Sequence, residues 1–118
     1  MEKLIIIIIF LVSQNIIYSQ SDCSELIKYV KSEDYGSTYY SYNSDAITKV
    51  TFYDVTENFQ TYYFAIVKFK DSYKEYIYQV GSNTKFNYSL HYLESAGKAF
   101  WEYIQPYNEN IQCGPDFN

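Results

Sequence analysis

The 118-residue chain contains no arginine, and all nine of its basic residues are lysines. Because the planar guanidinium group is the side chain best suited to bidentate binding of phosphate, carboxylate and guanine edges, this composition disfavours those modes of recognition. Fourteen acidic residues give a formal net charge of −5. That charge also disfavours nucleic acid as a partner, since phosphate neutralisation supplies most non-specific affinity.

Residues that carry catalysis are equally scarce, with one histidine and two cysteines in the whole chain. His91 lies close in sequence to Glu94 and Ser95, but no second base, nucleophile turn or oxyanion element accompanies them. Neighbouring carboxylates at Glu33 and Asp34 are interpreted as solvent-facing charges beside a turn rather than as a glycosidase pair. We predict a protein that is not an enzyme, with no catalytic residue, no metal and no cofactor; a small hydrolase that uses His91 is the alternative.

The beginning of the chain has the pattern of a signal peptide. Residues 4–12 are a continuous apolar run of the length of a signal-peptide core, too short to cross a bilayer comfortably. A small residue at Ser19 and an aliphatic one at Ile17 suit cleavage just after Ser19. We predict a signal peptide over residues 1–19, a single mature domain over residues 20–118 without a membrane span, and a secreted or periplasmic location. A retained N-terminal anchor is the alternative.

The two cysteines stand near the two ends of the predicted mature chain, at Cys23 and Cys113. In an oxidising compartment, two such residues predict one structural disulfide. A redox pair or a metal site is disfavoured because the chain has no Cys-x-x-Cys spacing and only one histidine.

What the chain has in excess is tyrosine, with 16 residues, and aromatic side chains are 21% of the sequence. One small core does not need so many, so a share of them is expected at half-buried or exposed positions. A Ser/Tyr/Asn tract over residues 37–45 is interpreted as an edge strand or an ordered loop, and its tyrosines serve either packing or recognition. The candidate binding surface consists of these aromatic residues: Tyr35, Tyr39, Tyr40, Tyr42, Trp101 and Tyr107.

Hydrophobic periodicity predicts three strands in the middle of the chain. Apolar and polar residues alternate over residues 46–55, placing Ile47 on the face opposite Val50. Residues 61–70 are apolar on both faces, which is typical of a central strand, and residues 73–80 form the third strand. The connections between them, residues 56–60 among them, are short, which predicts an antiparallel meander.

One helix is predicted before the strands in the sequence and another after them. A short amphipathic helix covers residues 24–31, with Asp22 or Ser24 as its N-cap. The clearest helix runs over residues 96–104, with Ser95 as N-cap and Pro106 just beyond its end.

Residues 86–93 fit two periods at once. Phe86, Leu90 and Leu93 have helical spacing, whereas Phe86, Tyr88, Leu90 and Tyr92 alternate as in a strand. The pattern alone leaves both possibilities open.

The region over about residues 44–107 resembles the KTSC-type domain, a family that occurs alone in bacteria and at the C-terminus of some lysyl-tRNA synthetases. The residues that carry this resemblance are a Tyr-x-Tyr followed by Val, then Ser-x-Gly-x-x-Phe and Ile, which here are Tyr76, Tyr78, Val80, Ser95, Gly97, Phe100 and Ile104. The family's tyrosine beyond this helix corresponds to Tyr107. Gly81 stands where the family has proline, and Trp101 where it has asparagine. The resemblance implies a structural role for the motif and favours helix over residues 86–93, and RNA binding has been suggested for the family.

A basic and aromatic sheet face is geometrically possible for RNA binding. Lys68 and Lys70 share a strand face with Tyr62 and Phe64, and Lys49 and Lys74 lie on the neighbouring strands. The net charge favours the simpler interpretation, a solvated lysine edge that discourages aggregation. Nucleic acid therefore stays an alternative that rests on analogy with the family.

Together these patterns predict a small α+β domain in which an antiparallel meander of three to four strands packs against a C-terminal helix, with a short N-terminal helix and one disulfide. The predicted function is that of an exported, non-catalytic binding module of the cell envelope that recognises a protein or peptide. An inhibitor or immunity protein against a basic hydrolase or toxin is an alternative, because acidic charge would speed such an association. Carbohydrate binding by aromatic stacking is another.

Overall fold

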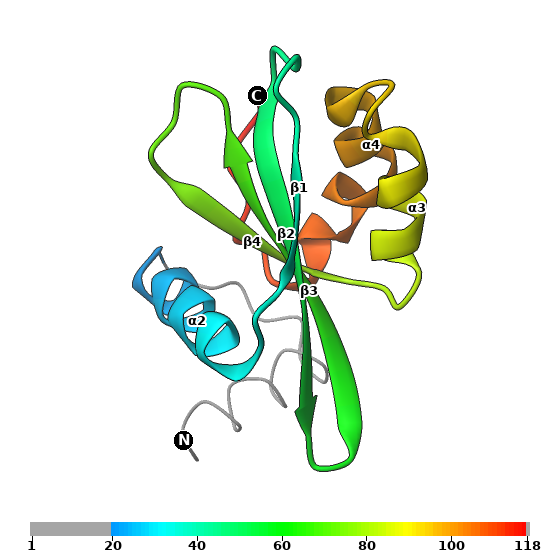
Figure 1. Cartoon of the computed structure of the whole chain (residues 1–118). Coiled ribbons are helices and arrows are strands. Elements are labelled where there is room, and N and C mark those ends of the chain that lie inside the picture. Colours follow the sequence, from blue (N-terminus) through cyan, green and yellow to red (C-terminus); the bar gives the residue numbers. More distant parts are fainter. Residues whose placement is uncertain (1–19, 118) are drawn as a thin grey trace.

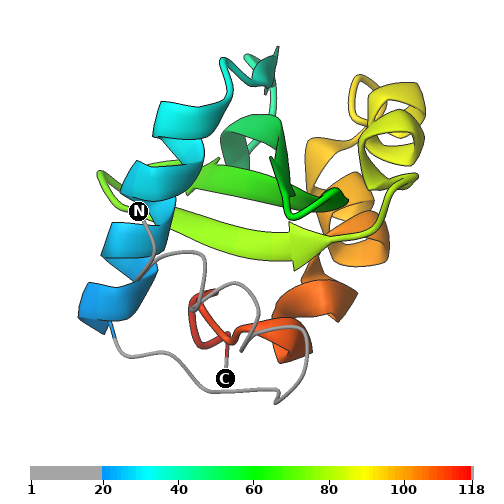
Figure 2. The ribbon, with the colours of Figure 1, turned by 90° about the horizontal axis from the view of Figure 1, so that it is seen from below.

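The computed structural model describes residues 20–117, so the predicted signal peptide lies outside the described residues. Its elements are, in order, α2 (Gln20–Glu33), β1 (Ser37–Tyr40), β2 (Ile47–Glu57), β3 (Gln60–Phe69), β4 (Glu75–Val80), α3 (Thr84–His91), α4 (Ala96–Tyr103) and the 3-10 helix η1 (Gln105–Asn110). The four strands form one antiparallel sheet in sequence order. Helix α2 covers one face of the sheet, and α3 and α4 cover the other (Figures 1 and 2). The predicted α+β class and the meander are confirmed.

Strand β3 is apolar on both faces because each of its faces belongs to a different core. Tyr62, Phe64 and Ile66 pack in the core beneath α2, while Ala65 and Val67 pack in the core beneath α3 and α4. The prediction of a central strand from this pattern is confirmed.

The core beneath α2 joins the two ends of the domain. Leu26 and Val30 of α2 are buried against Ile77 of β4 and against Ile111 near the end of the chain. The predicted disulfide between Cys23 and Cys113 closes this core, with a Cα–Cα distance of 5.8 Å.

Helix α2 begins earlier than its apolar pattern indicates. Its first residue is Gln20, so Asp22 and Ser24 lie inside the first turns, and the prediction that either is the N-cap is wrong. Asp22 still has a stabilising place in the first turn, where a negative charge interacts favourably with the helix dipole.

The second core contains the large apolar and aromatic residues of the motif that carries the family resemblance. Tyr78, Phe100 and Ile104 are almost completely buried, and the ring centroids of Tyr78 and Phe100 lie 5.6 Å apart. Ser95 is the N-cap of α4, as predicted, because its Oγ accepts a hydrogen bond from the Lys98 N–H at 3.2 Å. Pro106 lies beyond the end of α4 at Tyr103, as predicted. It does not end helical structure altogether, because it lies in the first turn of the 3-10 helix η1.

A register shift between Ile47 and Lys49 changes the face on which β2 begins. The alternating pattern places Ile47 opposite Val50, but both are buried in the core beneath α3 and α4. An irregularity of this kind inserts a residue into the ladder, so side chains before it change face. That prediction for Ile47 was therefore wrong.

The β2–β3 connection is shorter than its polar sequence indicates. Both strands continue until Glu57 pairs with Gln60, which leaves only Asn58 and Phe59 as the turn. Both turn residues have positive φ, 53° and 65°, as a two-residue hairpin turn of type I′ requires. A phenylalanine is rare in that conformation, which is why the sequence gives no turn signal at Phe59.

Of the two alternatives for residues 86–93, the helical one is confirmed, because α3 runs over Thr84–His91. The helix buries the face opposite to the one that carries Phe86, Leu90 and Leu93. Tyr88 is completely buried and Tyr92 is half-buried, with their rings stacked at 5.5 Å. Phe86, Leu90 and Leu93 are 63%, 61% and 82% exposed. The spacing of four between the two tyrosines is also helical. The core buries the tyrosine rings, whose apolar area is larger than that of the leucine side chains.

Candidate functional site

The structure does not bring the six candidate binding residues together on one surface. Tyr39 points into the core beneath α3 and α4, where its ring lies 5.8 Å from that of Phe52 and 5.2 Å from that of Tyr92. Its role is packing, the simpler of the two interpretations of the tyrosine tract.

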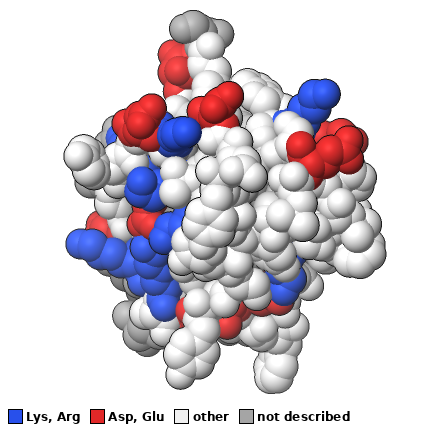
Figure 3. Space-filling view, turned by 45° about the horizontal axis from the view of Figure 1, so that its top comes forward, with Lys and Arg blue, Asp and Glu red and all other residues white. Residues whose placement is uncertain are grey.

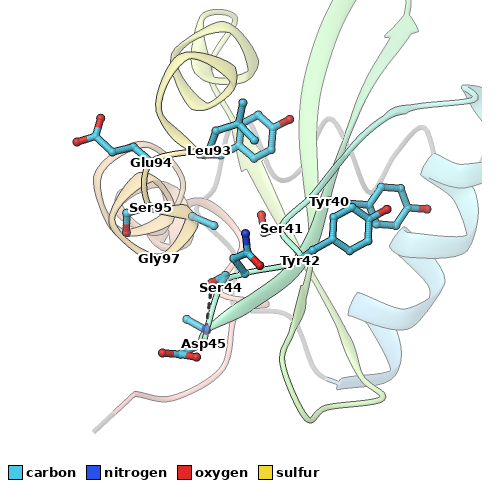
Figure 4. Close-up of a pocket in the computed structure, with 13 residues that line it drawn as sticks. Tyr40, Ser41, Tyr42, Ser44, Asp45, Leu93, Glu94, Ser95 and Gly97 are labelled. Carbon is cyan, nitrogen blue, oxygen red and sulfur yellow. Dashed lines mark hydrogen bonds between the residues drawn. The ribbon is translucent and has the colours of Figure 1, made fainter.

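Tyr40 and Tyr42 lie on the other side of the first strand and are exposed, at 47% and 86%. Their rings are stacked, with centroids 5.8 Å apart and planes 10° from parallel. Figure 4 shows the two rings side by side, directed away from Leu93 and Glu94. The Nζ atom of Lys49 lies 5.9 Å from the Tyr40 ring centroid, within the range of a cation–π contact.

The remaining three candidates lie elsewhere. Tyr35 is fully exposed just before Gly36, whose φ of 80° turns the chain into β1. Trp101 is half-exposed on α4 and contacts Phe117, with ring centroids 4.9 Å apart. Tyr107 lies over Gly81, where an added Cβ would be 2.5 Å from the tyrosine hydroxyl oxygen. The departure from proline to glycine at Gly81 thus accompanies a close approach of Tyr107.

A groove of about 430 Å³ opens between the β1–β2 connection and the α3–α4 connection (Figure 4). One wall is formed by residues 40–46 and the other by residues 92–97. Ser44 holds the first wall in place, because its Oγ accepts hydrogen bonds from the N–H groups of Ala46 and Ile47 at 3.1 and 3.0 Å. The second wall includes the exposed Leu93, together with Ser95 and Gly97 of the family motif.

Ser41, which lines the groove, and Tyr88 of α3 each carry a buried hydroxyl group. Ser41 Oγ and the Tyr88 hydroxyl are both buried and have no partner at hydrogen-bonding distance among the described residues. Burial raises the pKa of Tyr88 to about 12, a rise that the nearby Ser41 hydroxyl partly offsets and the neighbouring Tyr92 reinforces. Tyr88 therefore stays neutral through the physiological range.

Buried tyrosines predict that the fold loses stability in alkaline solution. Desolvation raises the pKa of Tyr29, Tyr53 and Tyr78 as well as that of Tyr88, and Tyr29 is also bonded to Glu57. A group whose folded pKa lies above its unfolded value of 10 stabilises the protein below pH 10 and loses this contribution as the pH rises. We expect Tyr88 alone to cost about 2 kcal/mol between pH 10 and 12, measured by urea unfolding across that range.

The matched control is Tyr88→Phe, which keeps the ring and removes the ionisable hydroxyl. This variant should lose less stability between pH 10 and 12 than the natural protein, by about the contribution of Tyr88. Identical pH profiles for the two proteins would contradict the assignment.

The three residues considered for catalysis do not converge on one another. His91 Nδ1 lies 3.0 Å from the Asn87 carbonyl oxygen, one turn earlier in the same helix, and Ser95 Oγ caps α4. Figure 4 shows the Glu94 carboxylate directed away from the groove. Over residues 20–117, no group of three or more His, Cys, Asp or Glu side chains is placed to hold a metal ion.

Sequence reasoning missed the groove and the exposed face of α3. Leu90 and Leu93 have the spacing of a buried stripe, and only the stacked tyrosines on the opposite side of α3 show that the leucines face solvent. The walls of the groove come from two connections about 50 residues apart in the chain, and no local pattern indicates that they meet. The signal that could have helped is the helical spacing of Tyr88 and Tyr92.

None of the helices in the described part of the chain is long and apolar enough to cross a membrane. Comparisons of the chain with models of known protein families, with curated proteins and with solved structures found no match. The resemblance to the KTSC-type domain stays a prediction that rests on the residues of the motif.

Proposed function

We propose that this protein is an exported, non-catalytic binding module of the cell envelope that recognises a protein or peptide through the groove and the aromatic pair beside it. The observation that carries the proposal is the stacked and exposed pair Tyr40 and Tyr42, which borders a groove of about 430 Å³. Stacked tyrosines present a rigid apolar area with polar tips, and such residues supply much of the binding energy in protein interfaces.

The second wall supports a protein or peptide in preference to a carbohydrate. Leu93 borders the groove opposite the tyrosines, and Leu90 and Phe86 continue this exposed apolar stripe along α3. Aliphatic side chains offer little to a sugar but bury well against apolar side chains of a protein. The disulfide supports export, because such bonds persist in oxidising compartments.

The proposal predicts that Tyr40→Ser together with Tyr42→Ser abolishes partner capture. The purified protein would serve as bait in envelope extract, with bound proteins quantified by mass spectrometry and the affinity of any enriched protein then measured. Loss of two exposed anchors at the centre of an interface should weaken binding by at least about thirtyfold, or roughly 2 kcal/mol.

The control is Tyr73→Ser, which removes a fully exposed tyrosine from the β3–β4 connection, away from the groove. This variant should capture the same proteins as the natural chain. Equal capture by the double variant would show that the pair is not the binding surface.

An inhibitor or immunity protein is the second candidate, and the tip of the β2–β3 hairpin favours it. Phe59 is fully exposed there with positive φ, so the chain keeps a strained and solvated phenylalanine at a projecting point (Figure 1). A ring in this position fits insertion into an apolar pocket of a target enzyme. Adding Phe59→Gly to the capture experiment separates the two candidates: loss with this variant alone favours the inhibitor.

A further inference from the structure

A row of side chains crosses the α2 face of the sheet just beyond the helix. Tyr40 of β1 pairs with Lys49 of β2, Lys49 pairs with Lys68 of β3, and Lys68 pairs with Glu75 of β4. Residues directly opposite one another point to the same face, and the row ends where Lys31 of α2 binds Glu75 at 2.7 Å. We call Tyr40, Lys49 and Lys68, together with Tyr42, which stacks on Tyr40, the tyrosine–lysine row.

The charges in this row are not balanced. Glu75, which lies directly opposite Lys68, is already paired with Lys31, and over residues 20–117 neither Lys49 nor Lys68 forms a salt bridge. Both lysines are half-buried. Like charges directly opposite each other in a sheet are destabilising, and Lys49 and Lys68 stand in that register.

Protection against aggregation does not explain these two lysines. Lysine blunts edge strands, where unpaired backbone groups would otherwise recruit another chain. Lys49 and Lys68 lie on β2 and β3, the two inner strands, whose backbone groups are paired on both sides. In Figure 3, basic atoms gather at the left, the side of β4 and α2.

We propose that the tyrosine–lysine row binds an acidic, extended segment of the partner. Two carboxylates separated by one residue would lie about 7 Å apart in that segment, within the reach of lysine side chains on strands about 4.8 Å apart. An apolar or aromatic side chain next to them packs on the exposed face of the Tyr40–Tyr42 stack. The inference rests on the proposed function and names the chemistry of the peptide.

An acidic peptide fits better than a polyphosphate. Nucleic-acid affinity grows with the number of neutralised phosphates, and a row with two lysines in a chain of charge −5 offers few such contacts. Two carboxylates, by contrast, would neutralise the pair that the free protein leaves uncompensated. An acidic segment therefore supplies the opposite charge that this like-charged pair lacks.

The test is binding of a fluorescent decapeptide of alternating Glu and Ser with a terminal Tyr, followed by anisotropy, to the full protein. We expect saturable binding that weakens with added salt and that falls at least about tenfold for Lys49→Gln with Lys68→Gln. The matched control is Lys85→Gln with Lys98→Gln, which removes the same charge from α3 and α4 and should change affinity less than about twofold.

Several results would overturn the inference: no saturable binding, equal binding of the peptide with Gln in place of Glu, or equal loss in both lysine pairs. Tighter binding of an oligonucleotide of the same charge, lost with the same two lysines, would assign the row to nucleic acid instead. Envelope capture separates this inference from the proposed function. If capture is lost with the tyrosine variant but kept with Lys49→Gln and Lys68→Gln, the acidic segment is refuted and the proposed function is not.

Discussion

Replacing Cys23 and Cys113 with alanine is expected to lower the free energy of unfolding by about 4–5 kcal/mol, the largest effect of any substitution considered for this fold. The bridge spans a sequence separation of 90, so its removal returns a long loop of conformational freedom to the unfolded chain. Both cysteines are also buried in the core that contains Leu26 and Ile111, so some packing is lost as well. Urea unfolding of the variant and the natural protein measures the difference.

The control for this prediction is the natural protein unfolded with a reductant present, because reduction cuts the bridge without changing any side-chain volume. Its loss of stability should be close to that of the double alanine variant. A loss below about 1 kcal/mol in both would mean that the unfolded chain gains almost nothing from the bridge's removal, and the chain-entropy account would fail here.

Phe100→Ala is expected to cost about 3–5 kcal/mol, because it empties the centre of the core beneath α3 and α4. The Phe100 side chain is 1% exposed and contacts the rings of Phe69 and Tyr78 at centroid distances of 5.2 and 5.6 Å. Removing it leaves a cavity between α4 and two strands that rigid aromatic neighbours fill poorly. The midpoint of urea unfolding reports the change.

Trp101→Ala on the same helix is the matched control. Trp101 is half-exposed, so its truncation should cost clearly less than that of Phe100 despite the larger side chain. Equal losses for the two variants would place the core of this half of the molecule elsewhere. The comparison also tests the structural role that the family resemblance implies for Phe100.

Most of the sheet could be predicted because β3 and β4 follow simple rules. The two-sided apolar pattern of residues 61–70 has one physical cause, burial on both faces, and β4 alternates cleanly between Ile77 and Tyr78. The disulfide was predictable for a similar reason, since two cysteines allow one pairing. Local chemistry was also sufficient for the cap at Ser95.

What the sequence could not predict depends on contacts between distant segments. Tyr39 and Tyr40 are adjacent and chemically identical, and only the pairing of β1 with β2 decides that one is core and the other surface. The same holds for α3, where Tyr88 displaces the leucines from the core. Likewise, the two like charges of Lys49 and Lys68 become neighbours only through the register of β2 with β3.

The position of the disulfide also determines how the molecule carries mechanical tension. Cys23 lies in the first described helix and Cys113 near the last described residue, with their Cα atoms 5.8 Å apart. A pulling force applied to the two ends of the chain therefore passes through the covalent sulfur bridge and bypasses the sheet and both cores. With the bridge intact, such a force does not load the residues between the two cysteines, and reduction transfers the tension to the hydrogen bonds and packing of the fold.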